Sequence, residues 1–157
     1  MVILNIETST NCCSVAITID GEVVTMAANL DGANHASELP VYIEQVMKKA
    51  KENDWKLDAV ALSQGPGSYT GLRIGCSTAK GLCYGLNIPM IPVDTLQIIG
   101  AAALAKSKEK ITSDGMLCPL LDARRMEVYT SIYTHESVRV REIEAKIVDE
   151  ASWNEEL

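Results

Sequence analysis

Three strand patterns follow one another at the start of the chain, before any helical pattern. Residues 2–8, 12–19 and 22–28 are rich in β-branched residues, as is typical of half-buried strands. Asp20-Gly21 separates the last two segments, and this dipeptide is a strong signal for a two-residue hairpin. The order predicts an antiparallel meander of three strands.

Helical and strand patterns alternate after this meander. Apolar residues recur at helical spacing over residues 37–53, 70–86 and 95–108, and short apolar strand patterns cover residues 58–63 and 89–93. Helices inserted between strands imply parallel additions to the sheet. We therefore expect residues 1–110 to form an α/β subdomain with the ribonuclease-H-like order, a mixed sheet flanked by helices.

A second set of strand patterns follows a polar stretch at residues 111–115. Residues 116–148 contain three such patterns, with turns near residues 123–124 and 135–136, and the last nine residues have the pattern of a capped helix at its start. We expect residues 111–157 to begin a second subdomain of the same kind, which is incomplete in this chain.

The composition excludes several classes of function. The formal net charge is −7, and basic pairs such as Arg124-Arg125 are too short to form a nucleic-acid stripe. No apolar run reaches the roughly 18 residues of a membrane span. The five cysteines have no metal-site spacing, which favours free thiols in a reducing compartment. We expect a cytoplasmic protein that binds neither membranes nor, by itself, RNA.

The stretch "SQGPGSYTGLRIGCSTAKGLCYG" at residues 63–85 looks like a phosphate-binding turn that leads into a helix. It lacks the Gly-Lys-Ser/Thr of a Walker loop, and Thr70 stands where a dinucleotide fingerprint needs glycine. Gly67 and Ser68 at the helix start are compatible with two roles, binding of an anion or capping of the helix.

The turn "IETST" between the first two strands is a second candidate phosphate loop. Actin-type ATPases hold a phosphate on such a hairpin, with a leading aspartate, whereas Glu7 leads it here. The extra methylene displaces the carboxylate, so Thr8, Ser9 and Thr10 either form a vestigial phosphate loop or only complete the turn.

Metal binding and autonomous catalysis have little support in the sequence. His35 has Leu39 four residues later, so no histidine pair exists on the first helix. Only two histidines are present, and they build no convincing nucleophilic triad. We assign no catalytic residue and no metal ligand.

The helix after the glycine-rich turn has two unlike sides. At about 100° per residue, an apolar stripe of Leu72, Cys76, Ala79, Cys83 and Leu86 is expected to face the sheet. The opposite side is small and almost uncharged, which suits the close approach of another helix, either from a partner or from the same chain. The expected partner interface consists of Thr70, Arg73, Ile74, Ser77, Lys80, Gly81, Tyr84 and Gly85.

Five segments resemble one family in the right order. They are "ILNIETSTNCCSVAI", "NHASELP", "SQGPGSYTGLRIGCSTAKGL", "IPMIPVDTLQIIG" and "LLDARRMEVYTSIY". Together they resemble the TsaB (YeaZ) family from Met1 to about Tyr133. The resemblance implies an actin-like (ASKHA) fold of two ribonuclease-H-like subdomains and a non-catalytic platform role in forming tRNA threonylcarbamoyladenosine.

The resemblance also implies partners. Family members pair through the first two helices, with themselves and with TsaD, the catalytic subunit that transfers the threonylcarbamoyl group to adenosine, and the ATPase TsaE joins them. We expect a homodimer that also binds TsaD, that meets tRNA only through the complex, and that has no cofactor of its own, ATP being bound only within the complex. TsaD holds its metal through an H-x-x-x-H pair, and the matching segment here, His35 to Leu39, lacks the second histidine.

One alternative from another class stays open. It is an enzyme that acts alone, ATP-dependent or metal-dependent, of the actin-like or glycoprotease-like class.

Overall fold

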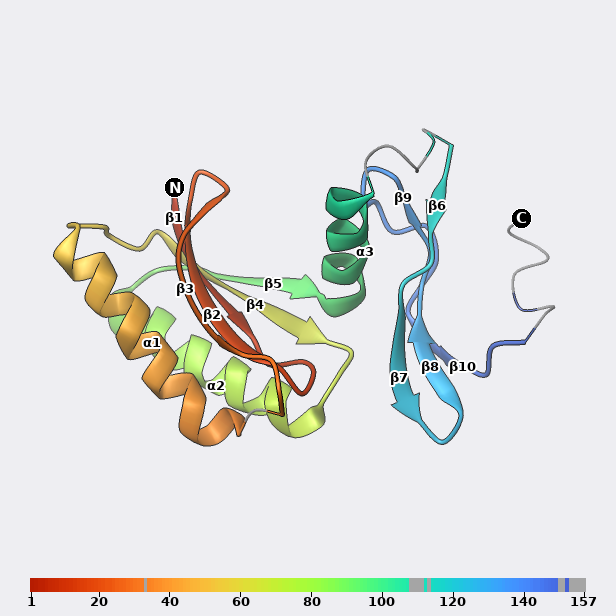
Figure 1. Cartoon of the computed structure of the whole chain (residues 1–157), viewed down its shortest axis with the longest axis horizontal. Coiled ribbons are helices and arrows are strands. Elements are labelled where there is room, and N and C mark those ends of the chain that lie inside the picture. Colours follow the sequence, from red (N-terminus) through yellow and green to blue (C-terminus); the bar gives the residue numbers. More distant parts are fainter. Residues whose placement is uncertain (33, 108–111, 113, 150–151, 153–157) are drawn as a thin grey trace. The chain divides into compact units, whose positions relative to one another are not determined.

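The computed structural model describes residues 1–32, 34–107, 112, 114–149 and 152, which form two compact units (Figure 1). The first unit runs from Met1 to Asp94 and the second from Thr95 to Leu157. This division groups the third helix with the second unit, whereas the sequence places the subdomain boundary near residue 110. The subdomain boundary stays a prediction.

The first unit is built on a five-stranded mixed sheet with the order β3-β2-β1-β4-β5. The strands are β1 (Val2–Glu7), β2 (Cys13–Ile19), β3 (Glu22–Asn29), β4 (Ala59–Gly65) and β5 (Met90–Asp94). The first three are antiparallel neighbours, and β4 and β5 add in parallel. Asp20 and Gly21 join β2 to β3 with φ angles of 49° and 91°, as a type I′ turn requires. The predicted meander and the ribonuclease-H-like order are confirmed.

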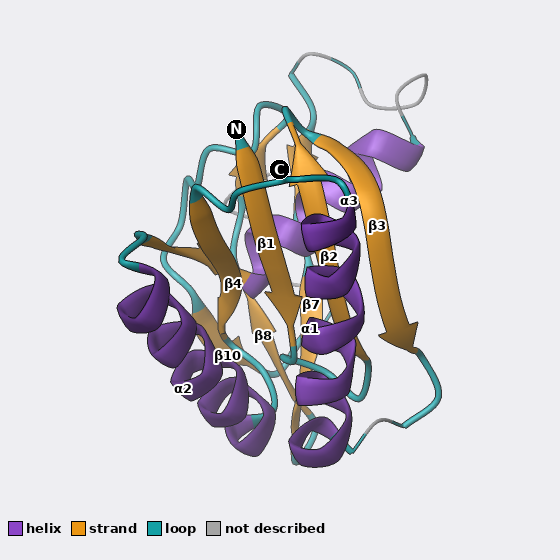
Figure 2. Ribbon diagram, turned by 90° about the vertical axis from the view of Figure 1, so that its left-hand side faces the viewer, coloured by secondary structure: helices purple, strands orange, loops and turns teal. Residues whose placement is uncertain are grey.

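Helices α1 (His35–Glu52) and α2 (Tyr69–Leu86) lie side by side against this sheet (Figure 2). They share one hydrophobic core with the strands, in which Leu39 and Val46 of α1 and Ala79 of α2 pack against Leu4 and Val15. Helix α1 begins two residues earlier than predicted, because the Asn34 carbonyl accepts hydrogen bonds from the backbone N–H groups of residues 37 and 38.

The second unit contains helix α3 (Thr95–Lys106) and, among its described residues, five short strands where the sequence predicts three. They are β6 (Met116–Leu117), β7 (Leu120–Arg124), β8 (Glu127–Thr130), β9 (Tyr133–Thr134) and β10 (Glu144–Lys146). Strands β7, β8 and β10 form one antiparallel sheet, and β6 pairs with β9. The predicted turns near residues 123–124 and 135–136 are close to those observed.

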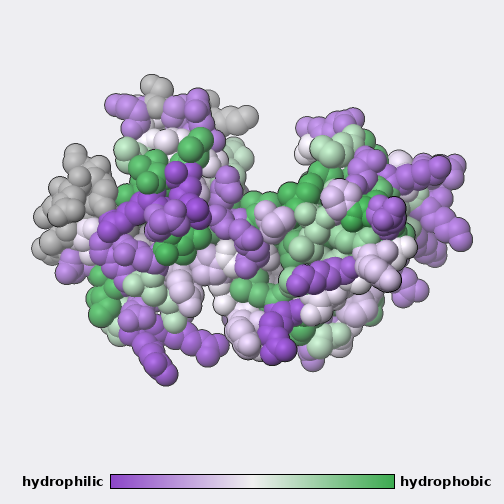
Figure 3. Space-filling model, turned by 180° about the vertical axis from the view of Figure 1, so that it is seen from behind, coloured by the Kyte–Doolittle hydropathy of each residue, from purple (hydrophilic) through white to green (hydrophobic). Residues whose placement is uncertain are grey.

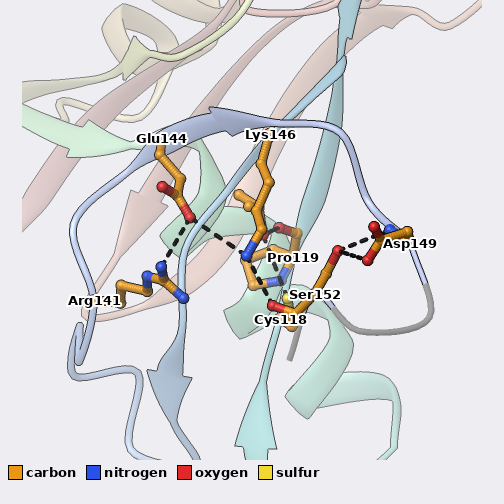
Figure 4. Close-up of polar contacts among 8 residues, drawn as sticks. Cys118, Pro119, Arg141, Glu144, Lys146, Asp149 and Ser152 are labelled. Carbon is orange, nitrogen blue, oxygen red and sulfur yellow. Dashed lines mark hydrogen bonds and ion pairs between the residues drawn. The ribbon is translucent and has the colours of Figure 1, made fainter. Parts of the chain in front are cut away.

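The last described strand is held by polar contacts (Figure 4). Glu144 on β10 lies 3.3 Å from the Arg141 guanidinium and 4.0 Å from the Lys146 ammonium. Lys146 also donates a 2.8 Å hydrogen bond to the Ser152 carbonyl, and the Ser152 hydroxyl donates to Asp149 at 2.8 Å. Of the terminal helix predicted for residues 149–157, only residues 149 and 152 are described.

Candidate partner interface and the loop beneath it

The buried side of α2 is centred on two glycines and an alanine. Gly71, Gly75 and Ala79 are the buried residues of this helix, and they follow one another at a spacing of four. Ala79 confirms the centre of the predicted apolar stripe, since its exposed fraction is 0%. Leu86 at the end of that stripe is a wrong prediction, because it is 46% exposed. The two glycines face Thr8 of the loop between β1 and β2, and Cys76 and Cys83 of the stripe are partly buried against the core.

The two buried glycines allow α2 to approach the loop between β1 and β2 closely. A Cβ atom at Gly71 would overlap the Thr8 carbonyl oxygen, and one at Gly75 would overlap the Thr8 hydroxyl oxygen. Thr8 and Ser9 are 1% and 2% exposed. The helix therefore packs on the loop at a distance that no side chain larger than hydrogen permits.

Most residues of the two candidate phosphate loops meet at this place. The Ser68 N–H donates a 2.6 Å hydrogen bond to the Ser9 carbonyl, and a Cβ atom at Gly67, whose φ is 154°, would overlap the same carbonyl. The Ser9 hydroxyl is buried and has no hydrogen-bond partner among the described residues. The two loops thus touch through their own backbones.

Glu7 is turned into its own loop. Its Oε1 atom accepts hydrogen bonds from the Ser9 N–H at 2.6 Å and from the Ser63 hydroxyl at 2.9 Å. Thr10 stands apart from the contact with α2 and accepts a 3.2 Å hydrogen bond from the Cys12 N–H. Ser68 caps α2 by accepting from the Gly71 N–H at 3.3 Å. These contacts are those of turn completion and helix capping, the second of the two roles considered for each loop.

His35 is the first residue of α1, and its side chain bonds to the loop before β2. Its Nε2–H donates to the Cys12 carbonyl at 3.1 Å, which holds the helix start against the chain. Within the described ranges, no group of three or more His, Cys, Asp or Glu side chains is placed to share a metal ion. Nor does any helix in those ranges have the length and apolar character to cross a membrane.

Burial also changes the acidity of Cys13, one of five free cysteines. Its side chain is 0% exposed, and burial, with smaller contributions from the charges of Glu38 and Glu7, raises the pKa of the Cys13 thiol to about 11. A thiol held protonated in this way is a core residue and not a nucleophile.

The other side of α2 is open. Of the eight predicted interface residues, Ile74 is half-buried and the other seven are exposed. Among the described residues, no atom beyond the adjacent residues and the helix's own backbone lies within 4 Å of a Cβ atom built at Gly81 or Gly85, and Tyr84 between them is 92% exposed. Figure 3 shows this side as a pale, weakly polar band along α2, interrupted by a few hydrophilic side chains.

A groove of about 470 Å³ separates α1 from α2 near the starts of both helices. It is lined by Ala36 and Pro40 of α1 and by Tyr69, Thr70, Arg73, Ile74, Ser77 and Thr78 of α2. Four predicted interface residues line it, and the other four, Lys80, Gly81, Tyr84 and Gly85, lie farther along α2. The resemblance implies pairing through the first two helices, but the residues named from the sequence were all on α2. The α1 wall was therefore missed, although the small and rigid residues Ala36 and Pro40 were a readable signal.

The groove has one charged lining residue. The Arg73 guanidinium lies 5.5 Å from the centre of the Tyr69 ring, in a cation–π contact. Helix α2 contains no acidic residue. The arrangement offers a mostly uncharged concave surface beside a cation, which suits a helix of another protein better than a small polar substrate.

The TsaD family model, described as tRNA N6-adenosine threonylcarbamoyltransferase, matches residues 28–153. Several curated proteins described as tRNA threonylcarbamoyladenosine biosynthesis protein TsaB are also similar. The Buchnera aphidicola (Acyrthosiphon pisum) protein is 32% identical over 98% of this chain and 70% of its own length. The Haemophilus influenzae and Escherichia coli proteins are 32% and 34% identical over 88% and 85% of this chain. The chain spans 56% and 55% of those two relatives.

A solved structure supports the same grouping. YeaZ from Pseudomonas aeruginosa superposes with a TM-score of 0.72 and 26% sequence identity, over 92% of this chain and 64% of that chain.

Proposed function

Because the chain belongs to the TsaB (YeaZ) family, we propose that it serves tRNA threonylcarbamoyladenosine biosynthesis as a non-catalytic platform subunit that binds the catalytic subunit TsaD. Its fold is actin-like, with a ribonuclease-H-like mixed sheet flanked by helices. The single observation that carries the proposal is the open side of α2 with the groove beside it. A glycine pair and small hydroxyl side chains on an exposed helix permit another helix to approach closely.

The loops beneath α2 support the non-catalytic part of the proposal. Glu7 accepts hydrogen bonds from Ser9 in its own loop and from Ser63 on β4. The start of α2 is occupied by Thr8 and Ser9 backbone atoms. A nucleotide phosphate at this place would have to displace these contacts. We propose that ATP is bound only within the assembled complex.

The remaining partners follow from the same role. The relatives' name concerns tRNA, yet the net charge of −7 opposes binding of a polyanion by this chain alone. We propose that tRNA and the ATPase TsaE meet the chain through the complex, that two copies pair through the α1–α2 side when TsaD is absent, and that the complex works in the cytoplasm.

Gly81→Leu tests the interface, and Ala79→Leu is its matched control. A Cβ atom at Gly81 meets no neighbouring atom of the described residues within 4 Å, so the leucine is accommodated and the removal of a helical glycine gains about 0.5–1 kcal/mol of stability. The same side chain blocks a partner helix, so binding to TsaD and self-association are both lost. Ala79→Leu overfills the core and costs about 1–3 kcal/mol.

Thermal unfolding and light scattering after size-exclusion chromatography, with and without TsaD, measure both effects. If the Gly81→Leu chain stays folded and still binds, the partner sits elsewhere. If it unfolds as readily as the Ala79→Leu chain, this side of α2 is internal core.

Calorimetry distinguishes the platform subunit from the alternative, an enzyme that acts alone. Titration of the isolated chain with ATP and Mg²⁺ is expected to give no heat of binding. A dissociation constant in the micromolar range would favour the enzyme over the platform.

A further inference from the structure

Arg73 is an unneutralised cation at the mouth of the α1–α2 groove. Its side chain is exposed, and the ring of Tyr69 is its only specific contact among the described residues. The positions three and four residues away on α2, where an acidic side chain would reach it, hold Tyr69, Thr70, Cys76 and Ser77. No acidic side chain of α2 therefore neutralises the exposed Arg73, whose guanidinium is solvated.

Covering the groove with a helix would remove that water. An arginine that loses its hydration without gaining an acceptor opposes association, whereas a carboxylate placed opposite it gives a charge-assisted and geometrically specific bond. The Tyr69 ring holds the guanidinium at the groove mouth, which reduces the entropy lost when such a bond forms.

We propose that the partner helix that covers the groove presents a carboxylate to Arg73, and that this ion pair determines which helix is accepted. The inference rests on the proposed function, in which the α1–α2 side binds TsaD. It adds the chemistry of the contact, an acidic side chain on an otherwise small and apolar helix face, and it makes Arg73 the specificity-determining residue of the groove.

The charges favour a heterologous partner over a second copy. The α2 side of a second copy brings only Arg73 and Lys80, with no acid, and each copy has a net charge of −7. On α1, the exposed acid Glu44 stands one helical turn beyond the groove residue Pro40 and on the same face. Self-pairing through Arg73 would depend on that residue.

The test measures binding of the 157-residue chain to TsaD of the same organism, by calorimetry at several NaCl concentrations. Arg73→Glu is expected to weaken binding by at least about tenfold, because it sets two carboxylates against each other. Arg73→Met is expected to weaken it less and to flatten the dependence on salt. Lys56→Glu is the control, because it makes the same charge change on an exposed loop residue outside the groove.

Three results would overturn the inference. Equal effects of Arg73→Glu and Lys56→Glu would show that only net charge matters, and the platform role would stand. Unchanged TsaD binding together with weakened self-association by Arg73→Glu, restored in Arg73→Glu/Glu44→Arg, would assign the ion pair to a second copy. Absence of TsaD binding by the wild-type chain would remove the proposed function together with the inference.

Discussion

Each half of α2 contains a pair of glycines four residues apart, but one pair is closely packed and the other is exposed. Gly71 and Gly75 stand four apart in the first half, and a Cβ atom on either would overlap Thr8. Gly81 and Gly85 stand four apart in the second half, and in the part of the chain that the structure describes no atom beyond the adjacent residues and the helix's own backbone lies within 4 Å of a Cβ atom there. One pair brings the helix onto the β1–β2 loop, and the other leaves a smooth side exposed.

The difference teaches that glycine spacing alone does not separate internal packing from a surface for a partner. Both pairs cost helix stability, since each glycine is less favourable than alanine by about 1 kcal/mol. In the first half the close contact with the loop offsets that cost within the chain. In the second half, no contact among the described residues of the first unit offsets the cost of the two glycines. We therefore assign the second pair to a partner.

The largest expected effect is at Gly71. In Gly71→Ala the new methyl group meets the Thr8 carbonyl, which is backbone and cannot turn away. We expect a loss of about 3 kcal/mol or more in the free energy of unfolding, at the upper end of overpacking costs. Urea unfolding followed by circular dichroism measures it. Alanine is favoured over glycine in a helix by about 1 kcal/mol. A loss smaller than about that amount would show that the contact with Thr8 is loose.

Gly75 should respond less, because its neighbour is a side chain. A Cβ atom there meets the Thr8 hydroxyl oxygen first, so Gly75→Ala is expected to cost about 1–3 kcal/mol. Thr8→Ala removes that oxygen, and the double variant should be more stable than the sum of the two single effects predicts. Additive effects in this cycle would contradict a direct contact between the two residues.

The open half should respond in the opposite direction. Gly81→Ala adds a methyl group that meets no neighbour among the described residues, so we expect a gain of about 0.5–1 kcal/mol from the lower backbone entropy of the unfolded chain. The same urea experiment compares it with the Gly71→Ala chain. A loss of stability at Gly81 would mean that the second half is packed within the chain, and it would remove the contrast between the two halves.

Much of the first unit could be predicted because its signals are local. The Asp20-Gly21 hairpin, the helical spacing over α1 and α2, and the cap at Ser68 depend on neighbouring residues. The rotation of α2 on the sheet could not be predicted, because it depends on a contact between Gly71 and a loop 63 residues earlier in the chain. The apolar stripe drawn at 100° per residue assigned Leu86 to the sheet, because it followed the large apolar side chains and gave no weight to a buried glycine.

The candidate site was predicted only in part, because some of its features are local to one helix and others depend on contacts between distant parts of the chain. The exposed side of α2 is visible in one helix, so its residues could be named from the sequence. The groove needs a second wall, Ala36 and Pro40, and which helix stands beside α2 is a property of the fold. The burial of Thr8 and Ser9 likewise depends on α2 lying over them, and the two candidate phosphate loops could be examined only one at a time.

A pH dependence is also expected, and it originates beneath the helices, at Cys13. Burial raises the pKa of this thiol to about 11 from the ordinary value of 9.0. The unfolded chain releases this proton near pH 9 and the folded chain near pH 11, so the folded state holds the proton more tightly and loses stability as the pH rises between these values.

Unfolding free energies at pH 8 and pH 10 measure the change, with Cys13→Ala as the control. Cys83 and Tyr42, whose pKa values burial also raises, contribute to both chains, so the difference between the two profiles isolates Cys13. Identical profiles would mean that the Cys13 thiol ionises as readily in the folded chain as in the unfolded one, and that water reaches the core under α1 and α2.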